Sequence, residues 1–134
     1  IAAADPKIIN AAVCARESGN VTFYFSSVHS YLSSLNPMES HWLNDQSYPA
    51  TIRCLTPRDL LLELGVGSTS LDILVVDAES MDFEILDSFF EIKGFNPVMI
   101  VVEWFIIARE YNHTTIDRMV DKIHAKGYDL HTDG

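Results

Sequence analysis

The chain is poor in cysteine and glycine, and both shortages exclude classes of site. Its 134 residues include two cysteines, Cys14 and Cys54, and six glycines. Two cysteines are too few for a disulfide framework, and they lack the CxxC or Cys/His spacing of a zinc site. We therefore expect Cys14 to be a small core residue. The glycines form no phosphate-cradling loop between a strand and a helix, because Gly65 and Gly67 follow a helical pattern instead.

Basic residues are also scarce, with nine Lys and Arg against 19 Asp and Glu. Nucleic acid is therefore excluded as a partner, because phosphate binding needs clustered positive charge. The formal net charge of −10 indicates a solvated acidic surface.

Long apolar runs are missing as well, and none approaches the roughly 20 residues of a membrane span. Residues 1–7 show no signal-peptide pattern, so the compartment stays open, with the cytoplasm slightly favoured. Asn-x-Thr sequons begin at Asn20 and Asn112, and they matter only in a secretory compartment.

What is present is a single domain with alternating strand and helix patterns. Apolar and β-branched runs predict strands over residues 8–14, 21–25, 51–55, 71–76, 98–102 and 128–131. The first two are expected to pair as an antiparallel hairpin, and 51–55 is expected to be an edge strand. Continuous apolar runs at 71–76 and 98–102 are typical of strands buried on both faces.

Capping signals predict the helices between these strands. Thr56 and Pro57 begin the first helix and Gly65 ends it. Ser80 is expected to cap the second, and a capping box at Thr114 and Asp117 the third. The alternation predicts an α/β fold with a doubly wound sheet and right-handed crossovers.

Carboxylates follow both of the continuous apolar strands. Asp77 and Glu79 come after the run 71–76, and Glu103 follows the run 98–102. Ligands of open parallel sheets bind beyond the carboxyl ends of the strands, so these acids mark a candidate site for acid–base work. A weaker hypothesis makes them a Mg²⁺ or Ca²⁺ site. The alternative is that they are capping or solvated acids at a helix N-terminus.

A long segment, residues 26–49, carries aromatic and imidazole side chains. His29, Tyr31, His41 and Trp42 could line an acceptor pocket, and the alternative is a surface loop that binds nothing. Trp104, next to Glu103, is expected to be a core residue because its side chain is large and aromatic. The alternative is a lid over the acceptor.

Four segments together resemble the FkbM-type S-adenosylmethionine-dependent methyltransferases. They are INAAVCARESGNVTFYFSS, TIRCLTPRDLLLELG, VVDAESMDFEIL and PVMIVVEW, in the family's order. The match departs from the family at Ser80, where the family has glycine. It also lacks the glycine-rich first loop and the acid that ends the second strand.

The resemblance implies a partial Rossmann-like domain that lacks the first two strands and the last strand. It implies O-methylation of a hydroxyl on a small molecule or sugar, with S-adenosylmethionine as cofactor near Ala12, Val13 and Asp77. Asp77 and Glu79 would position or deprotonate the acceptor, with Glu103 in support. The chain alone is expected to be inactive.

A different reading needs no catalysis. The alternative is a truncated α/β binding or assembly module whose acidic edge holds a cation or a basic partner. Open sheet edges would then favour a homodimer.

Overall fold

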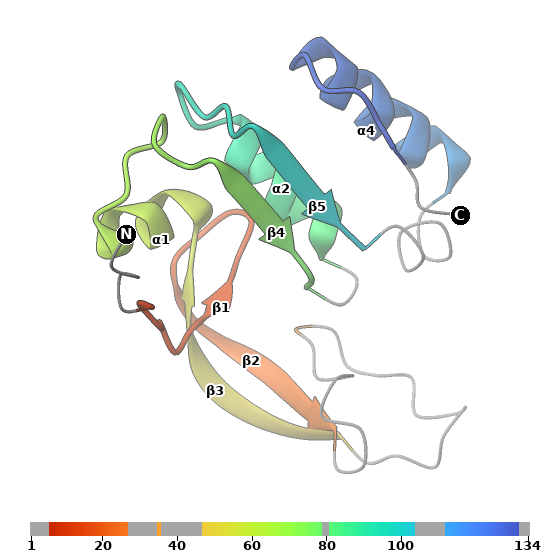
Figure 1. The fold of residues 1–134 in the computed structure, drawn as a ribbon. Coiled ribbons are helices and arrows are strands. Elements are labelled where there is room, and N and C mark those ends of the chain that lie inside the picture. Colours follow the sequence, from red (N-terminus) through yellow and green to blue (C-terminus); the bar gives the residue numbers. More distant parts are fainter. Residues whose placement is uncertain (1–5, 27–34, 36–46, 79–80, 104–111, 132–134) are drawn as a thin grey trace.

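A computed structural model describes residues 6–26, 35, 47–78, 81–103 and 112–131. These residues form a mixed α/β fold with two small sheets and three helices (Figure 1). The elements are β1 (Ala12–Val13), β2 (Gly19–Ser26), β3 (Ser47–Leu55), α1 (Pro57–Leu64), β4 (Ile73–Val76), α2 (Asp82–Phe90), β5 (Met99–Val102) and α4 (His113–Ala125). The expected single doubly wound sheet is not what the described residues form.

The first sheet has the order β1-β3-β2, so the predicted hairpin of the first two strands is wrong. β3 lies between them, parallel to β1 and antiparallel to β2. It is therefore the central strand and not an edge. The chain after β1 passes the end of β3, where the Cys14 amide donates to the Leu55 carbonyl over 2.8 Å and the Thr56 amide donates to Ser18 Oγ over 2.9 Å.

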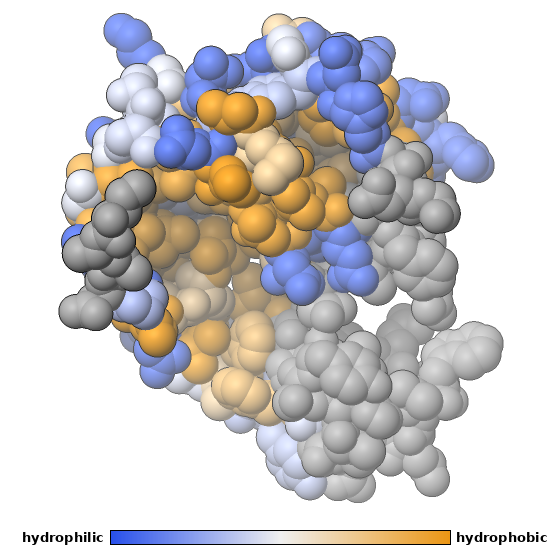
Figure 2. All heavy atoms as spheres, in the orientation of Figure 1, coloured by the Kyte–Doolittle hydropathy of each residue, from blue (hydrophilic) through white to orange (hydrophobic). Residues whose placement is uncertain are grey.

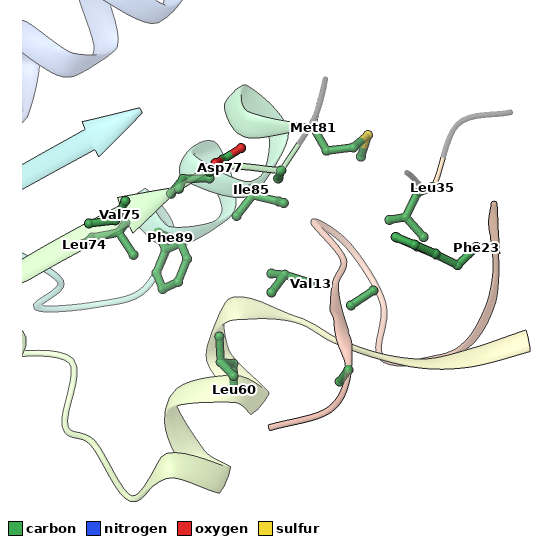
Figure 3. Close-up of a pocket in the computed structure, with 14 residues that line it drawn as sticks. Val13, Phe23, Leu35, Leu60, Leu74, Val75, Asp77, Met81, Ile85 and Phe89 are labelled. Atoms are coloured by element: carbon green, nitrogen blue, oxygen red, sulfur yellow. The ribbon is translucent and has the colours of Figure 1, made fainter. Parts of the chain in front are cut away.

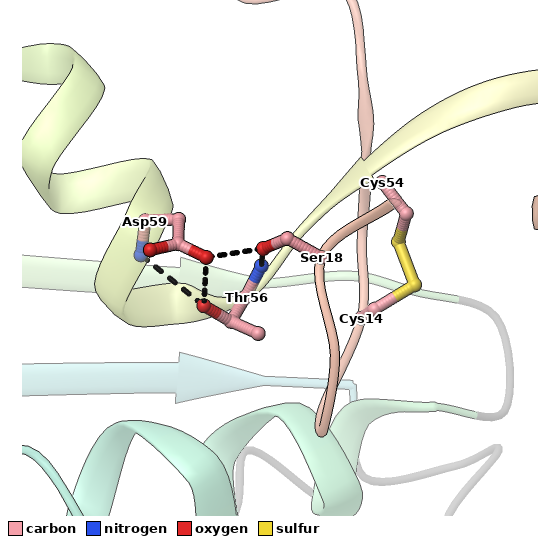
Figure 4. The surroundings of a disulfide bond; sticks show 5 residues. All are labelled: Cys14, Ser18, Cys54, Thr56 and Asp59. Atoms are coloured by element: carbon pink, nitrogen blue, oxygen red, sulfur yellow. Dashed lines mark hydrogen bonds between the residues drawn. A yellow bond between two sulfur atoms is a disulfide. The ribbon is translucent and has the colours of Figure 1, made fainter. Parts of the chain in front are cut away.

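A disulfide joins Cys14 to Cys54, which corrects the expectation of a free core cysteine (Figure 4). The parallel register pairs Ala12 with Cys54, so Cys14 follows the end of β1 beside this strand. The two Cα atoms are 5.8 Å apart, a separation that a disulfide spans without backbone movement. The bond ties β1 to the centre of the sheet.

The second sheet consists of β4 and β5, which are parallel and connected through α2. Its inner face packs on α2, whose buried Phe83, Ile85, Leu86 and Phe89 form the centre of the hydrophobic core. The spacing of Met81, Ile85, Leu86 and Phe89 predicts an apolar stripe, and the structure buries the last three and half-buries Met81. Asp82 is the first residue of the helix, and Met81 is its N-cap. Ser80, the predicted cap, lies outside the described residues.

The outer face of this sheet is open, which contradicts the expectation of strands buried on both faces. The exposed side chains alternate with the buried ones, and they are Ile73, Val75, Met99 and Val101. We call these four residues the open face. Figure 2 shows apolar side chains gathered over β4 and β5, in front of α2. No described element covers them.

Helix α1 confirms its predicted boundaries. Thr56 Oγ1 accepts a hydrogen bond from the Asp59 amide, and Pro57 occupies the first helical position. Gly65 ends the helix with φ of 68°, a left-handed conformation that glycine adopts without steric cost.

The N-cap of helix α4 lies two residues earlier than predicted. Asn112, not Thr114, is the N-cap, and its Oδ1 accepts from the Thr115 amide over 2.9 Å. Met119 and Ile123 join the core, and Lys126 Nζ donates to the Phe90 carbonyl over 2.7 Å. The predicted strand 128–131 does not form in the described residues, and Tyr128 Oη instead donates to the Pro97 carbonyl over 2.7 Å.

Candidate functional site

A cavity of about 340 Å³ lies between the two sheets (Figure 3). One wall comes from β1 and its surroundings, with Ala12 and Val13 together with Phe23 of β2 and Leu60 of α1. This volume is at the lower end of the range for small-molecule sites.

The opposite wall comes from β4 and α2. It consists of Leu74 and Val76 from the strand, with Met81, Ile85 and Phe89 from the helix. Figure 3 shows Ile85 and Phe89 facing the space that Val13 borders on the other side. The cavity is therefore formed by residues far apart in the sequence, and its surface is largely apolar.

Asp77 is the one charged residue among the described residues that line the cavity. It follows β4 directly and is exposed to solvent. Figure 3 shows it at the tip of the strand, before Met81. The carboxylate therefore meets both solvent and the apolar wall of the cavity.

Asp82 holds the turn that follows Asp77, a role that was not predicted from the sequence. Its side chain is fully buried, and its Oδ1 accepts a hydrogen bond from the Ala78 amide over 3.1 Å. An acid in the first turn of a helix is otherwise expected only to interact favourably with the helix dipole. The signal that could have found it is the spacing of four residues from Ala78, which lets an acid at a helix start reach back to the end of the preceding strand.

The structure brings together some of the predicted site residues and not others. Ala12, Val13 and Asp77 line the same cavity. Glu103 follows β5 and is exposed, and it is not among the lining residues. The remaining predicted residues lie outside the described part of the chain, and they are Glu79, His29, Tyr31, His41, Trp42 and Trp104.

The side chains that line the cavity limit its chemistry. Within the described ranges, no group of three or more His, Cys, Asp or Glu residues could hold a metal ion. The described lining also has no Lys or Arg to attract an anion. The arrangement suits a ligand with a flat apolar body and a hydroxyl or amine that donates to Asp77.

Comparison of the chain with family models, curated proteins and solved structures finds no match. Among the described helices, none combines the length and the apolar character needed to cross a membrane.

Proposed function

We propose that this chain takes part in S-adenosylmethionine-dependent methyl transfer to a hydroxyl oxygen of a small molecule or sugar. The observation that carries the proposal is the cavity itself. The resemblance alone links Ala12, Val13 and Asp77 to the cofactor. They line one cavity, although Ala12 and Val13 lie in the first sheet and Asp77 follows a strand of the second.

The cavity fits part of the cofactor. Its apolar walls suit the adenine ring, and Asp77 can accept hydrogen bonds from ribose hydroxyls or from the ammonium group. The described lining offers no cation for the cofactor's carboxylate. A Rossmann-like methyltransferase fold of the protein that contains this chain belongs to the same proposal.

When bound, S-adenosylmethionine supplies a methyl group activated by the positive sulfonium. The chain's own part is to orient the acceptor and to take up its proton. Asp77 is proposed for both tasks, because its exposed carboxylate lines the cavity and can accept the hydroxyl proton. Glu79 and Glu103 are proposed to support it from the same end of the sheet.

The proposal predicts where a cofactor probe binds. Addition of S-adenosylhomocysteine to the isotope-labelled protein that contains this chain should shift the amide resonances of Ala12, Val13 and Ala78 in NMR spectra. Asp77→Asn should weaken this binding by about tenfold, since a hydrogen bond to a charged group contributes about 1.5–3 kcal/mol. Asp117→Asn on exposed α4 is the matched control and should leave the affinity unchanged.

The same pair of variants tests turnover in the protein that contains this chain. Transfer of labelled methyl groups to a panel of hydroxylated sugars should fall in Asp77→Asn and persist in Asp117→Asn. Shifts confined to residues outside the cavity, or equal affinity in both variants, would show that the cavity is not a cofactor site.

A further inference from the structure

Both Asn-x-Thr sequons lie on the surface of the folded chain. The first runs from Asn20 to Thr22 in β2, and the second from Asn112 to Thr114 at the start of α4. The asparagine and the threonine are exposed in each of them. Surface position is the property that an acceptor for N-linked glycan needs and that a chance match in a core lacks.

The disulfide is an independent observation that points to the same compartment. Cys14 and Cys54 are joined, and the described residues contain no free cysteine. Structural disulfides persist in oxidising environments, such as the lumen of the endoplasmic reticulum and the cell exterior, and are rare in the cytosol. Attachment of N-linked glycan takes place in that same lumen. We propose that Asn20 and Asn112 are N-glycosylation sites and that the chain matures in the secretory pathway.

The geometry of the first site leaves the acceptor accessible. β2 is at an edge of its sheet within the described part of the chain, since it pairs with β3 alone. Asn20 and Thr22 are two residues apart in an extended strand, so both side chains project from the same side. Asn20 pairs with Arg53, the neighbour of Cys54, and the disulfide therefore holds the strand that supports this site.

At the second site, Asn112 uses one side-chain atom to cap helix α4 and the other to accept the glycan. Asn112 caps α4 through Oδ1, which accepts from the Thr115 amide. The glycan bonds to the other side-chain atom, Nδ2. Modification therefore retains the cap, and the helix start can carry a glycan without losing its hydrogen bond.

The reaction needs a donor that the chain does not hold, a lipid-linked oligosaccharide diphosphate. The asparagine Nδ2 attacks the anomeric carbon of the donor, and a carbon–nitrogen bond forms. The bond from that carbon to the diphosphate oxygen breaks, and the lipid diphosphate leaves with the electron pair. Nδ2 gives up one proton to a base of the transferase. No oxidation or reduction takes place.

The test is mass spectrometry of the complete natural protein containing this chain, expressed with its own N-terminus in a eukaryotic host. Peptide-N-glycosidase in heavy-oxygen water converts each glycosylated asparagine to labelled aspartate. We expect label at Asn20 and Asn112. Thr22→Ala and Thr114→Ala should each remove one glycan and its mobility step on a gel, and both leave the asparagines and the Asn112 cap in place.

Matched controls separate loss of the sequon from loss of folding. Thr22→Ser and Thr114→Ser keep the sequons and should keep both glycans. Thiol alkylation without reductant should leave Cys14 and Cys54 unmodified. Absence of label from either asparagine overturns the proposal for that site, and alkylated cysteines in the native protein overturn the assignment of compartment. Neither result depends on methyl transfer, so this inference and the proposed function can fail separately.

Discussion

Asp59 shows how a few local hydrogen bonds fix the start of a helix. Its carboxylate accepts from the hydroxyls of Ser18 and Thr56, while its amide donates to Thr56 Oγ1 (Figure 4). The pKa of Asp59 is held below its usual value, chiefly by the hydrogen bond from Ser18, then by that from Thr56 and by the charge of Arg58, with desolvation opposing. Ser18 thus links the segment after β1 to the first turn of α1.

This lowered pKa predicts how stability depends on pH. A carboxyl group whose pKa is lower in the folded state stabilises the protein above its unfolded pKa of about 3.9, and the stabilisation is lost as pH falls through the folded pKa. Ser18→Ala removes the largest cause, so the acid-dependent part of the unfolding free energy should shrink. Urea unfolding at a series of pH values between about 5 and 2 measures it.

Asp59→Asn supplies the comparison, because it removes the titrating group. Ser18→Ala added to Asp59→Asn should leave the pH dependence as it is in Asp59→Asn. If Ser18→Ala alone keeps the full wild-type slope, the hydrogen bond from Ser18 does not set this pKa.

Individual residues were predictable where their partners are near in sequence. The cap at Thr56 and the stop at Gly65 follow from residues within one turn. The pairing of Cys14 with Cys54 did not follow, because it depends on which strand lies beside β1. The cap at Asn112 was missed because two adjacent caps, Asn112 and Thr114, both fit the helix pattern, and only the backbone conformation decides between them.

At the scale of elements, helix faces were predicted better than strand pairing. The apolar stripe of α2 is set by its own periodicity, and the structure buries it as expected. The place of β1 depends on β3, which is separated from it by 40 residues at the disulfide. A short apolar run cannot specify such a distant partner, so its extent and pairing were both misjudged.

The disulfide should contribute measurably to the stability of the first sheet. Closing a loop of this length restricts the unfolded chain, and removal of such a bond typically costs about 2–4 kcal/mol. The double variant Cys14→Ser/Cys54→Ser should therefore unfold at lower denaturant concentration than the wild type. Reductant should leave the denaturant midpoint of the double variant unchanged. It should lower the denaturant midpoint of the wild type, because it breaks the disulfide.

The single variant Cys14→Ser distinguishes the bond from the packing of Cys54, which is fully buried. It should lose about as much stability as the double variant. A wild-type protein whose midpoint is indifferent to reductant would mean that the bond contributes nothing to the folded state.

At the scale of the whole molecule, the sequence predicted the α/β class but not the division into two sheets. The run 98–102 is apolar at every position and the run 71–76 at every position except Asp72, a composition typical of strands covered on both sides. In the described structure α2 covers one side only, and the open face stays exposed. Only the resemblance linked Ala12 and Val13 to Asp77 as residues of one site. A local sequence pattern cannot predict a contact between residues that lie far apart in the sequence.

The open face predicts opposite outcomes for two neighbouring valines. Val75 is 64% exposed and Val76 is 6% exposed. Val75→Thr should change the unfolding free energy by less than about 0.5 kcal/mol. Val76→Thr should cost about 1–3 kcal/mol, because it buries a hydroxyl in the core. Denaturant unfolding of both variants measures the difference.

Val75 also tests the alternative that the chain is an assembly module. If the open face mediates self-association, Val75→Lys should lower the apparent mass in sedimentation experiments at high concentration. Glu91→Gln, which removes an exposed negative charge at the C-cap of α2 and changes the net charge by the same one unit, is the control for net charge. An unchanged mass in Val75→Lys would exclude the open face as a contact between copies.

The cavity has a consequence for the mechanics of the fold, because its walls belong to sheets that share no strand. Helix α1, in contact with both β3 and α2, is the main structural bridge between them. A ligand that touches both walls would act as a second bridge. At a concentration about a hundred times its dissociation constant it would add about 2.7 kcal/mol to the unfolding free energy. This is as much as the disulfide is expected to contribute, so occupancy of the cavity would set how rigidly the two halves of the molecule move together.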